Sequence, residues 1–342
     1  MKFFFFIILA TLLLCCPSVF VERPVDYEIV YQKQAGKTKE ERIKNVQIYP
    51  SEIIMSNDGA VFVLDKHEDY YRLSKIPLGH GNPKELVLEK SSMELDERRS
   101  TELFPCRDGG LLLKYYRQDT YDSKYSLIVI HISKDMKIKN KFKSYVFGYA
   151  LPALKKGQNF YYSLSYNDEE NPRIVYIIDK NGNYLKLLDI NTKTTEASIG
   201  MVFNYYISTA YNDKYMAISN YGLYLFDPEN EYFDKMADLT KEINAVYKKL
   251  NGRKPKKSVS TFAVHYDSKT GFVVFAMNEY AGFMPRAKLL SRYIAAYNPT
   301  TKELKMMKLD DKFDDMIYLL GAWDGIVYVS NWETGMAYGL KF

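Results

Sequence analysis

The sequence is built on a repeat of about 50 residues. Six segments share one plan: an apolar run, a tight polar turn containing Asp, Asn, Gly or Lys, and a second apolar run. Such turns tolerate the positive φ angles of short hairpin connections, so each segment predicts a β-hairpin. Equivalent positions lie 50, 49, 55, 57 and 54 residues apart, at Val61, Leu111, Phe160, Tyr215, Phe272 and Ile326.

Each predicted hairpin is followed by a third apolar run and, in five repeats, by a fourth. Four strands per repeat and six repeats predict an all-β, six-bladed β-propeller with four antiparallel strands per blade. The sixth repeat ends at Phe342 after its third run, so residues 26–32 are expected to supply the missing strand and close the last blade. A pair of β-sandwiches would need a linker rich in Pro, Gly or Ser, and the middle of the sequence has none.

One amphipathic helix is predicted, over residues 238–250. Thr240 is the expected N-cap, and the apolar residues recur at helical spacing. The expected buried face consists of Ile243, Val246, Tyr247 and Leu250.

The pair Trp323-Asp324 has the letters of a WD repeat. WD repeats run about 40–45 residues, and the dipeptide closes the third strand of a blade. Here the repeat is longer, and Asp324-Gly325 stands between the first and second runs. The sequence therefore predicts a hairpin turn at this point, not a WD repeat.

The N-terminus predicts an export signal over residues 1–18, followed by a single domain over residues 19–342. Lys2 precedes an apolar run, residues 3–14, that is short for a membrane span, and Pro17 follows it. The alternative is a bacterial lipoprotein signal with Cys16 as the lipidated residue, although Leu14 stands where a smaller residue is usual. The expected location is secreted, periplasmic or anchored to the outer membrane.

Composition bears on disulfides, on core size and on nucleic-acid binding. If the signal is removed with Cys15 and Cys16, Cys106 remains alone and no intrachain disulfide can form. With 342 residues, 47% of them hydrophobic, the chain can bury a large core without disulfides. The net charge of +5 is spread along the chain, and the basic stretch 251–258 has no interleaved aromatics, so nucleic acid is not an expected partner.

The Asp-Gly hairpins at residues 58–59, 108–109 and 324–325, the turn DKNGNY at 179–184 and the export signal resemble those of exported, six-bladed, TolB-like propellers. Many of those are bacterial envelope proteins, often lipoproteins of Bacteroidetes. The resemblance covers the mature chain and is architectural. It implies the fold and the compartment, and it transfers no functional residue.

Long connections predict which side of the propeller binds. The turns within the hairpins and most turns between third and fourth runs are short, so chain length accumulates on the other side. Aromatic residues there could stack on a ligand and arginines could bind carboxylates or hydroxyls, although the aromatics could instead pack their own loops onto the blades. The predicted binding residues are Arg98, Arg99, Arg117, Tyr205, Tyr206, Tyr280, Phe283, Arg286 and Trp332.

Catalytic motifs are scarce, so the sequence leans away from an enzyme. The four histidines lack metal-ligand spacing, and no nucleophile elbow, phosphate loop or dinucleotide motif occurs. A glycan hydrolase or lyase would need paired carboxylates, which could also hold a structural calcium ion or be solvated residues at strand starts. The candidates at the predicted channel mouth are Glu52, Glu102, Asp314 and Asp315.

The sequence therefore favours a monomeric, non-catalytic binding protein without a cofactor. It is expected to recognise a glycan or a protein partner through the long-loop side. The alternative is a glycan-acting hydrolase or lyase that uses carboxylates at the central channel mouth.

Overall fold

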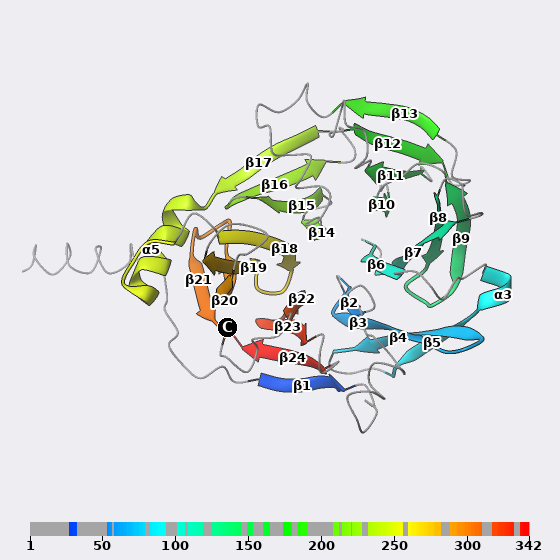
Figure 1. Cartoon of the computed structure of the whole chain (residues 1–342), viewed down its shortest axis with the longest axis horizontal. Coiled ribbons are helices and arrows are strands. Elements are labelled where there is room, and N and C mark those ends of the chain that lie inside the picture. The colour runs from blue at the N-terminus through cyan, green and yellow to red at the C-terminus, as the bar shows by residue number, and fades with distance from the viewer. Residues whose placement is uncertain are drawn as a thin grey trace, which may run out of the picture.

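Strands dominate the fold, and they pair in the order in which they occur in the chain (Figure 1). The computed structural model describes residues 27–32, 53–56, 58–78, 82–93, 101–106, 109–118, 125–144, 149–152, 160–164, 174–179, 184–189, 208–211, 214–219, 221–227, 232–255, 259–281, 288–309, 317–331 and 336–341. Within these ranges the strands form six four-stranded antiparallel sheets around a central axis, with β2, β6, β10, β14, β18 and β22 innermost.

The strands of each sheet are as follows. The first sheet has β2 (Ile53–Met55), β3 (Ala60–Lys66), β4 (Tyr70–Pro77) and β5 (Lys84–Glu89), and the second has β6 (Thr101–Pro105), β7 (Leu111–Gln118), β8 (Tyr125–Ile132) and β9 (Ile138–Ser144). The third has β10 (Tyr149–Pro152), β11 (Phe160–Leu164), β12 (Ile174–Asp179) and β13 (Tyr184–Asp189), and the fourth has β14 (Ser208–Tyr211), β15 (Lys214–Ser219), β16 (Gly222–Asp227) and β17 (Tyr232–Asp238). The fifth has β18 (Val259–Asp267), β19 (Phe272–Ala281), β20 (Lys288–Tyr297) and β21 (Leu304–Lys308), and the sixth has β22 (Ile317–Trp323), β23 (Ile326–Asn331), β24 (Met336–Lys341) and β1 (Tyr27–Gln32).

Side-chain packing is described for five of these sheets. Four buried clusters join the fourth sheet to the fifth, the fifth to the sixth, the sixth to the first and the first to the second. In β10–β13 and in β1 only the backbone is described. The all-β propeller is therefore established. The prediction of six four-stranded blades is corrected to five packed blades of three to four described strands, and each blade keeps the number of its sheet.

The N-terminal strand closes the last sheet, as the sequence predicted. β1 pairs antiparallel with β24, with Tyr27 opposite Leu340 and Gln32 opposite Met336. This pairing covers the edge that β24 would otherwise present to solvent. The two ends of the chain thus complete one sheet.

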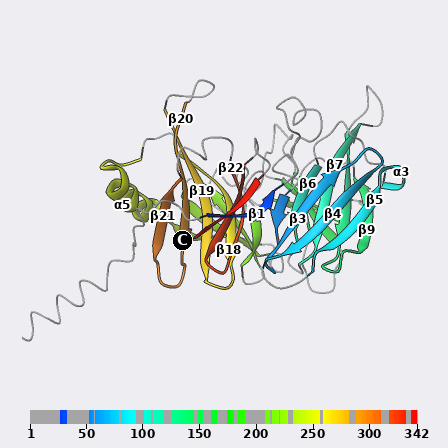
Figure 2. The same ribbon diagram turned by 90° about the horizontal axis from the view of Figure 1, so that it is seen from below.

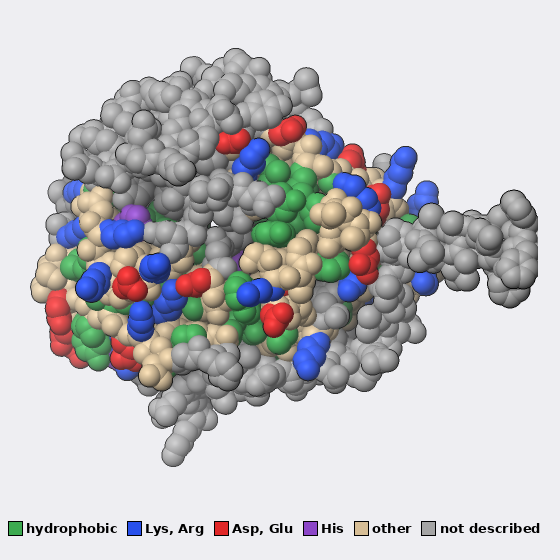
Figure 3. All heavy atoms as spheres, turned by 180° about the vertical axis from the view of Figure 1, so that it is seen from behind, with side chains coloured by type: hydrophobic (Ala, Val, Ile, Leu, Met, Phe, Trp, Pro, Cys, Tyr) green, Lys and Arg blue, Asp and Glu red, His purple; other side chains and the backbone are tan. Residues whose placement is uncertain are grey.

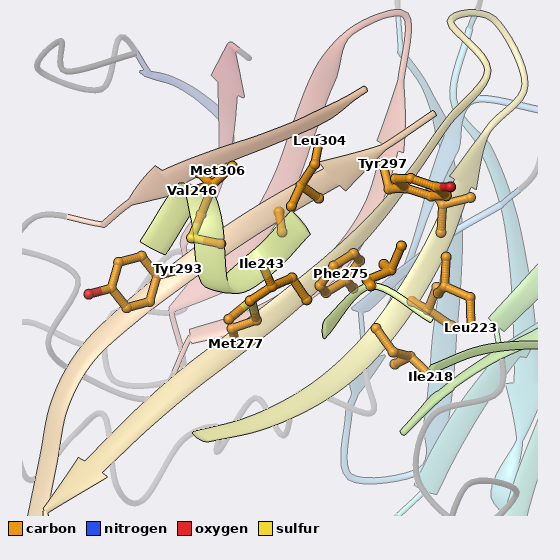
Figure 4. Close-up of a cluster of buried hydrophobic side chains, with 14 of the residues drawn as sticks. Ile218, Leu223, Ile243, Val246, Phe275, Met277, Tyr293, Tyr297, Leu304 and Met306 are labelled. Carbon is orange, nitrogen blue, oxygen red and sulfur yellow. The ribbon is translucent and has the colours of Figure 1, made fainter. Parts of the chain in front are cut away.

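Within the described ranges, two helices accompany the strands, α3 (Lys90–Met93) and α5 (Thr240–Asn251). Ile243, Val246 and Tyr247 of α5 are buried against Leu304 and Met306 of β21, which confirms most of the predicted apolar face (Figure 4). The helix extends the core between the fourth and fifth blades. None of the helices in the described part of the chain is long and apolar enough to cross a membrane.

The predicted N-cap of this helix was wrong. Thr240 is the first helical residue, and Asp238 Oδ1 accepts its backbone N–H at 3.0 Å. Hydrogen bonds from Thr240 also lower the pKa of Asp238. Leu239 occupies the N-cap position and has no side chain that can accept a hydrogen bond, so the Asp238 carboxylate accepts the Thr240 N–H at the positive end of the helix instead.

The turns inside the hairpins have the predicted chemistry. Asp324 and Gly325 form a two-residue connection between β22 and β23 with φ angles of 54° and 77°, as a type I′ turn requires. Trp323 therefore ends the first strand of its hairpin, which confirms that the Trp-Asp pair is not a WD repeat.

These turns also contact the turns of neighbouring blades. Asp267 at the end of β18 accepts the backbone N–H groups of Asp324 at 3.1 Å and Gly325 at 2.9 Å. The indole of Trp323 lies so close to Gly59 that a Cβ there would be 2.4 Å from Cε2. Contacts between turns thus run from the fifth blade through the sixth to the first.

The contacts continue from the first blade to the second. The Lys75 ammonium donates to Asp58 Oδ2 at 2.7 Å and to the Gly109 carbonyl at 3.0 Å. On this face, seen in Figure 3, described lysine, arginine, aspartate and glutamate side chains are interspersed, so no single-sign region forms. The turns on this face thus connect neighbouring blades.

One turn residue gives a stability prediction. Lys302 is exposed and has a φ of 61° in the β20–β21 turn, where its N–H donates to the Asn298 carbonyl. Lys302→Gly should raise the free energy of unfolding by about 0.5–1 kcal/mol, because glycine adopts this conformation without steric cost. Urea unfolding measures the change. Lys302→Ala keeps the Cβ and should give no gain; an equal gain in both variants would contradict the backbone explanation.

Candidate functional site

The fifth blade projects beyond its neighbours on the side opposite the linked turns. β19 and β20 have ten residues each, and Figure 2 shows their upper ends standing above the other strands. Within the described residues, β18 pairs with β19 only as far as Glu279, and β21 pairs with β20 only from Tyr293 onward. Tyr280 pairs with Leu289 and Ala281 pairs with Lys288. We call residues 280–281 and 288–292 the arm.

A buried ion pair fixes the base of the arm to α5. Glu279 is 1% exposed, and its carboxylate accepts hydrogen bonds from Arg253 at 2.7 Å (Nη1 to Oε1) and 3.0 Å (Nη2 to Oε2). The Tyr247 hydroxyl also donates to Glu279 Oε2. Bidentate, charge-assisted hydrogen bonds of this kind hold both groups in one geometry.

The electrostatics of the surrounding groups follow from this carboxylate. Burial and the hydrogen bond to Glu279 raise the pKa of Tyr247, and the hydrogen bond with Glu279 raises the pKa of Arg253. Burial, together with the charge of Glu279, raises the pKa of Tyr221 to about 12. All three groups therefore stay in their protonated forms near neutral pH, and none is poised to act as a general base.

Aromatic contacts reinforce the same junction. The rings of Tyr247 and Tyr293 are 5.3 Å apart, and the Tyr293 hydroxyl donates to Asn251 Oδ1 at 3.2 Å. The C-terminal end of α5 is thus attached both to β19, through Glu279, and to β20, through Tyr293. The helix ends here because Gly252, with a φ of 69°, adopts the left-handed conformation typical of a C-cap.

The other side of the arm base carries polar and aromatic groups. Asn278 Nδ2 donates to the Tyr280 hydroxyl at 3.0 Å, and Arg292 lies opposite Asn278 in the β19–β20 register. Burial raises the pKa of Tyr318 on β22, while the positive charge of Arg292 opposes that shift, so these two side chains are close. Amide, guanidinium and phenol groups together suit hydrogen bonding and stacking with a ligand.

Most of the predicted site residues lie outside the described residues. Tyr280 is the predicted residue whose side chain is described, and it lies at the projecting end of the fifth blade. Glu102 on β6 and Arg117 on β7 are placed by their backbone, opposite Lys114 and Ser126 respectively. The residues outside are Glu52, Arg98, Arg99, Tyr205, Tyr206, Phe283, Arg286, Asp314, Asp315 and Trp332, so their roles stay predictions.

Sequence reasoning missed Glu279 and Arg253. In β19 the odd-numbered residues Val273, Phe275 and Met277 are buried in the cluster with α5, and Glu279 continues that series. A charged residue at a core-facing position signals a buried partner. Arg253 belongs to the basic stretch 251–258, and the ion pair gives this residue a structural role.

His265 is a structural residue. It is 3% exposed, and its Nδ1 accepts the Ala322 backbone N–H at 3.0 Å, which joins the fifth blade to the sixth. Burial lowers the pKa of His265 to about 4, against a smaller opposing effect of Asp267. The imidazole is therefore neutral near pH 7.

His265 gives a pH prediction. Its pKa is about 4 in the folded state and 6.5 in the reference state, so the unfolded chain binds more protons between these values. Stability should therefore fall as the pH falls from about 6.5 to about 4, by up to about 3 kcal/mol. Urea unfolding from pH 7 to pH 4.5 measures the slope. His265→Asn, which keeps an acceptor and does not titrate, should show a flatter slope; an unchanged slope would contradict the assignment.

Metal binding has no support in the described part of the chain. Within it, no three His, Cys, Asp or Glu side chains come together as metal ligands would. The residues predicted for a structural calcium ion lie outside the description, apart from the backbone of Glu102. Cys106 is buried.

Comparison with known proteins found only distant structural similarities. No family model matches the chain, and no curated protein matches it. Similar solved structures include a DUF4221 family member from Bacteroides vulgatus, with 12% identity over 94% of this chain and 99% of that chain and a TM-score of 0.41. The CNH domain of AfRom2 has 11% identity over 85% and 81%, with a TM-score of 0.36. The WD40 domain of SCAP from fission yeast has 10% identity over 85% and 83%, with a TM-score of 0.35.

These likenesses are weak. The class of protein defined by the strand pairing is a β-propeller. The TolB-like subtype remains an expectation from the sequence.

Proposed function

We propose that the chain is a non-catalytic binding protein that recognises a glycan or a protein partner through the side on which the arm projects. The observation that carries this proposal is the arm itself, a projecting hairpin end held rigidly by the Glu279–Arg253 pair. Rigid elements that display aromatic and polar side chains favour recognition, because little conformational entropy is lost on binding.

The chemistry at the arm supports binding over catalysis. The buried carboxylate of Glu279 is neutralised by Arg253, and the nearby tyrosines have raised pKa values. A glycosidase requires two carboxylates in different protonation states on either side of a bond. The described groups at the arm therefore serve to hold a surface in place.

Substitution of Tyr280 tests the proposal. Wild-type protein and Tyr280→Ala are compared on arrays of polysaccharides and envelope proteins, with Lys302→Ala on the opposite side as the control. We expect Tyr280→Ala to bind a ligand of the wild-type protein at least tenfold more weakly, and we expect Lys302→Ala to bind it like wild type. Turnover of any glycan by the wild-type protein, or equal binding by both variants, would contradict the proposal.

We further propose that the protein is exported and acts as a monomer. The basic start and short apolar run of residues 2–14 support export. Mass spectrometry of the protein from envelope and medium fractions distinguishes the cleavage sites. A chain starting at residue 19 supports a signal peptide, a lipidated chain starting at Cys16 supports an anchor, and an intact cytoplasmic chain contradicts export.

A further inference from the structure

The C-terminal end of α5 is an Asn-Gly pair, Asn251 followed by Gly252. Asparagine before glycine is prone to deamidation, because glycine has no side chain to hinder attack of its backbone nitrogen on the asparagine side chain. The sequence contains the same pair at Asn181-Gly182, which lies outside the described residues. Asn251 therefore has the local sequence of a chemical modification site.

Deamidation needs water as its one co-reactant and involves no change of oxidation state. The Gly252 nitrogen, after losing its proton to solvent, forms a bond to Cγ of Asn251. The bond between Cγ and Nδ2 then breaks, and Nδ2 leaves as ammonia with a proton taken from water. Water opens the resulting cyclic imide at one of its two carbonyl carbons. The product is either an aspartate or an isoaspartate, in which the main chain continues through Cγ.

Both reacting groups are held by hydrogen bonds in the folded chain. The Gly252 N–H donates to the Lys248 carbonyl at 2.8 Å. Asn251 Nδ2 donates to the Tyr247 carbonyl at 3.2 Å, and Asn251 Oδ1 accepts the Tyr293 hydroxyl at 3.2 Å. The nitrogen thus keeps its proton, and the side chain is held at both of its polar atoms. The attack requires these hydrogen bonds to open first.

The position of the pair sets how it opens. Gly252 is exposed, and a Cβ there would meet nothing within 4 Å, so solvent reaches the turn from outside. Helix ends open locally at a lower free energy than the whole fold. Arg253, the next residue, is bound by the buried carboxylate of Glu279, and this ion pair opposes the opening.

The products of deamidation do not fit the folded junction. A carboxylate at position 251 has no N–H to donate, so one of its oxygens would face the Tyr247 carbonyl without a hydrogen bond. An isoaspartate adds a carbon atom to the main chain between α5 and Arg253. That insertion displaces Gly252 from the Lys248 carbonyl and Arg253 from Glu279.

We propose that Asn251 is a spontaneous deamidation site, that the junction between α5 and the base of the arm protects it, and that its modification releases the end of α5 irreversibly. The Glu279–Arg253 pair and the Tyr293 hydroxyl then have a second effect besides stability. They set how long the chain keeps its native covalent structure. This modification requires no ligand and is independent of the proposed binding function.

Peptide mapping by mass spectrometry tests the proposal. Full-length protein is incubated at about pH 8 in buffer and in urea, and conversion of Asn251 is followed over time. We expect conversion to be slower in buffer by about tenfold or more. Tyr293→Phe removes one hydrogen bond to Asn251 and should raise the rate in buffer by about threefold or more, with no change in urea. Tyr297→Phe, at the opposite end of β20 in the same buried cluster, is the matched control and should react like wild type.

Several results would overturn the inference. Equal rates in buffer and in urea would show that the junction gives no protection. Equal rates in buffer for wild type and Tyr293→Phe would exclude the hydroxyl from that protection. An intact Asn251 in urea, under conditions in which Asn181 reacts, would exclude the modification site itself.

Hydrogen exchange of the Gly252 amide keeps the test decisive if Tyr293→Phe fails to fold. In wild type the exchange of this amide should be slowed, relative to urea, by the same factor as the reaction of Asn251. Rapid exchange of Gly252 together with slow deamidation would contradict the proposed opening step.

Release of the helix end has a separate measurement. The deamidated protein carries one more negative charge, so ion exchange separates it from the unmodified protein. Trypsin should cut the deamidated protein after Arg253 about tenfold faster or more, because the end of α5 no longer packs against β19 and β20. Equal cleavage of the two forms would contradict the release.

Discussion

Gly321→Ala is expected to lower the free energy of unfolding by about 3 kcal/mol, one of the two largest effects of a single substitution that the structure predicts. Gly321 has a φ of 157°, which L residues rarely adopt. A Cβ there would lie 2.8 Å from Met55 Cβ and 2.9 Å from His265 Nε2. Both neighbours are buried, so neither can move away without disturbing the packing of the first, fifth and sixth blades.

A matched glycine separates steric crowding from backbone strain. Gly252 also has a positive φ, of 69°, but a Cβ there would meet nothing within 4 Å. Gly252→Ala should therefore cost only about 1 kcal/mol. Urea unfolding of both variants measures the difference, and equal losses would show that the three blades do not meet closely at Gly321.

Arg253→Ala is expected to cost about 2–3 kcal/mol, because it leaves the buried carboxylate of Glu279 without its cation. Glu279 is 1% exposed whereas the Arg253 side chain is 43% exposed, so the two halves of the pair are not equivalent. Glu279→Gln removes the buried charge and leaves an arginine that water can solvate. It should cost only about 1 kcal/mol.

The double variant tests the pairing directly. Arg253→Ala/Glu279→Gln should be more stable than Arg253→Ala alone, because the uncompensated charge is gone. Urea unfolding of the four proteins completes the cycle, with Lys254→Ala as a control at an exposed neighbour. Additive losses from the two substitutions would contradict a coupled pair.

Local patterns in the sequence were sufficient to predict the strands and turns. Short apolar runs predicted strands such as β19, and Asp324-Gly325 predicted a hairpin turn, because these preferences act over a few residues. The closing strand β1 was predicted because the sixth repeat has only three apolar runs and needs a fourth strand. The prediction of six equivalent blades went further than the described side-chain packing, which extends over five.

Contacts between distant segments could not be predicted in the same way. Nothing near Gly59 in the sequence indicates that Trp323 lies against it, since that contact depends on how the ring closes. Glu279 was detectable by its core-facing position, but its partner Arg253 was not, because the end of α5 is placed by tertiary packing. Tyr280 was predicted from loop content and lies on the projecting arm, and its binding role, like that of the other site residues, stays a prediction.

The contact of Trp323 with Gly59 has a consequence for biosynthesis. The ribosome adds Trp323 long after Gly59, and the partner strand β24 of β1 comes later still. The first blade is therefore made long before the groups that cover its inner turn and complete the ring. Closure therefore joins residues of high sequence separation, and such steps are slow. Until it occurs, the first blade presents uncovered edges, which are sites of aggregation.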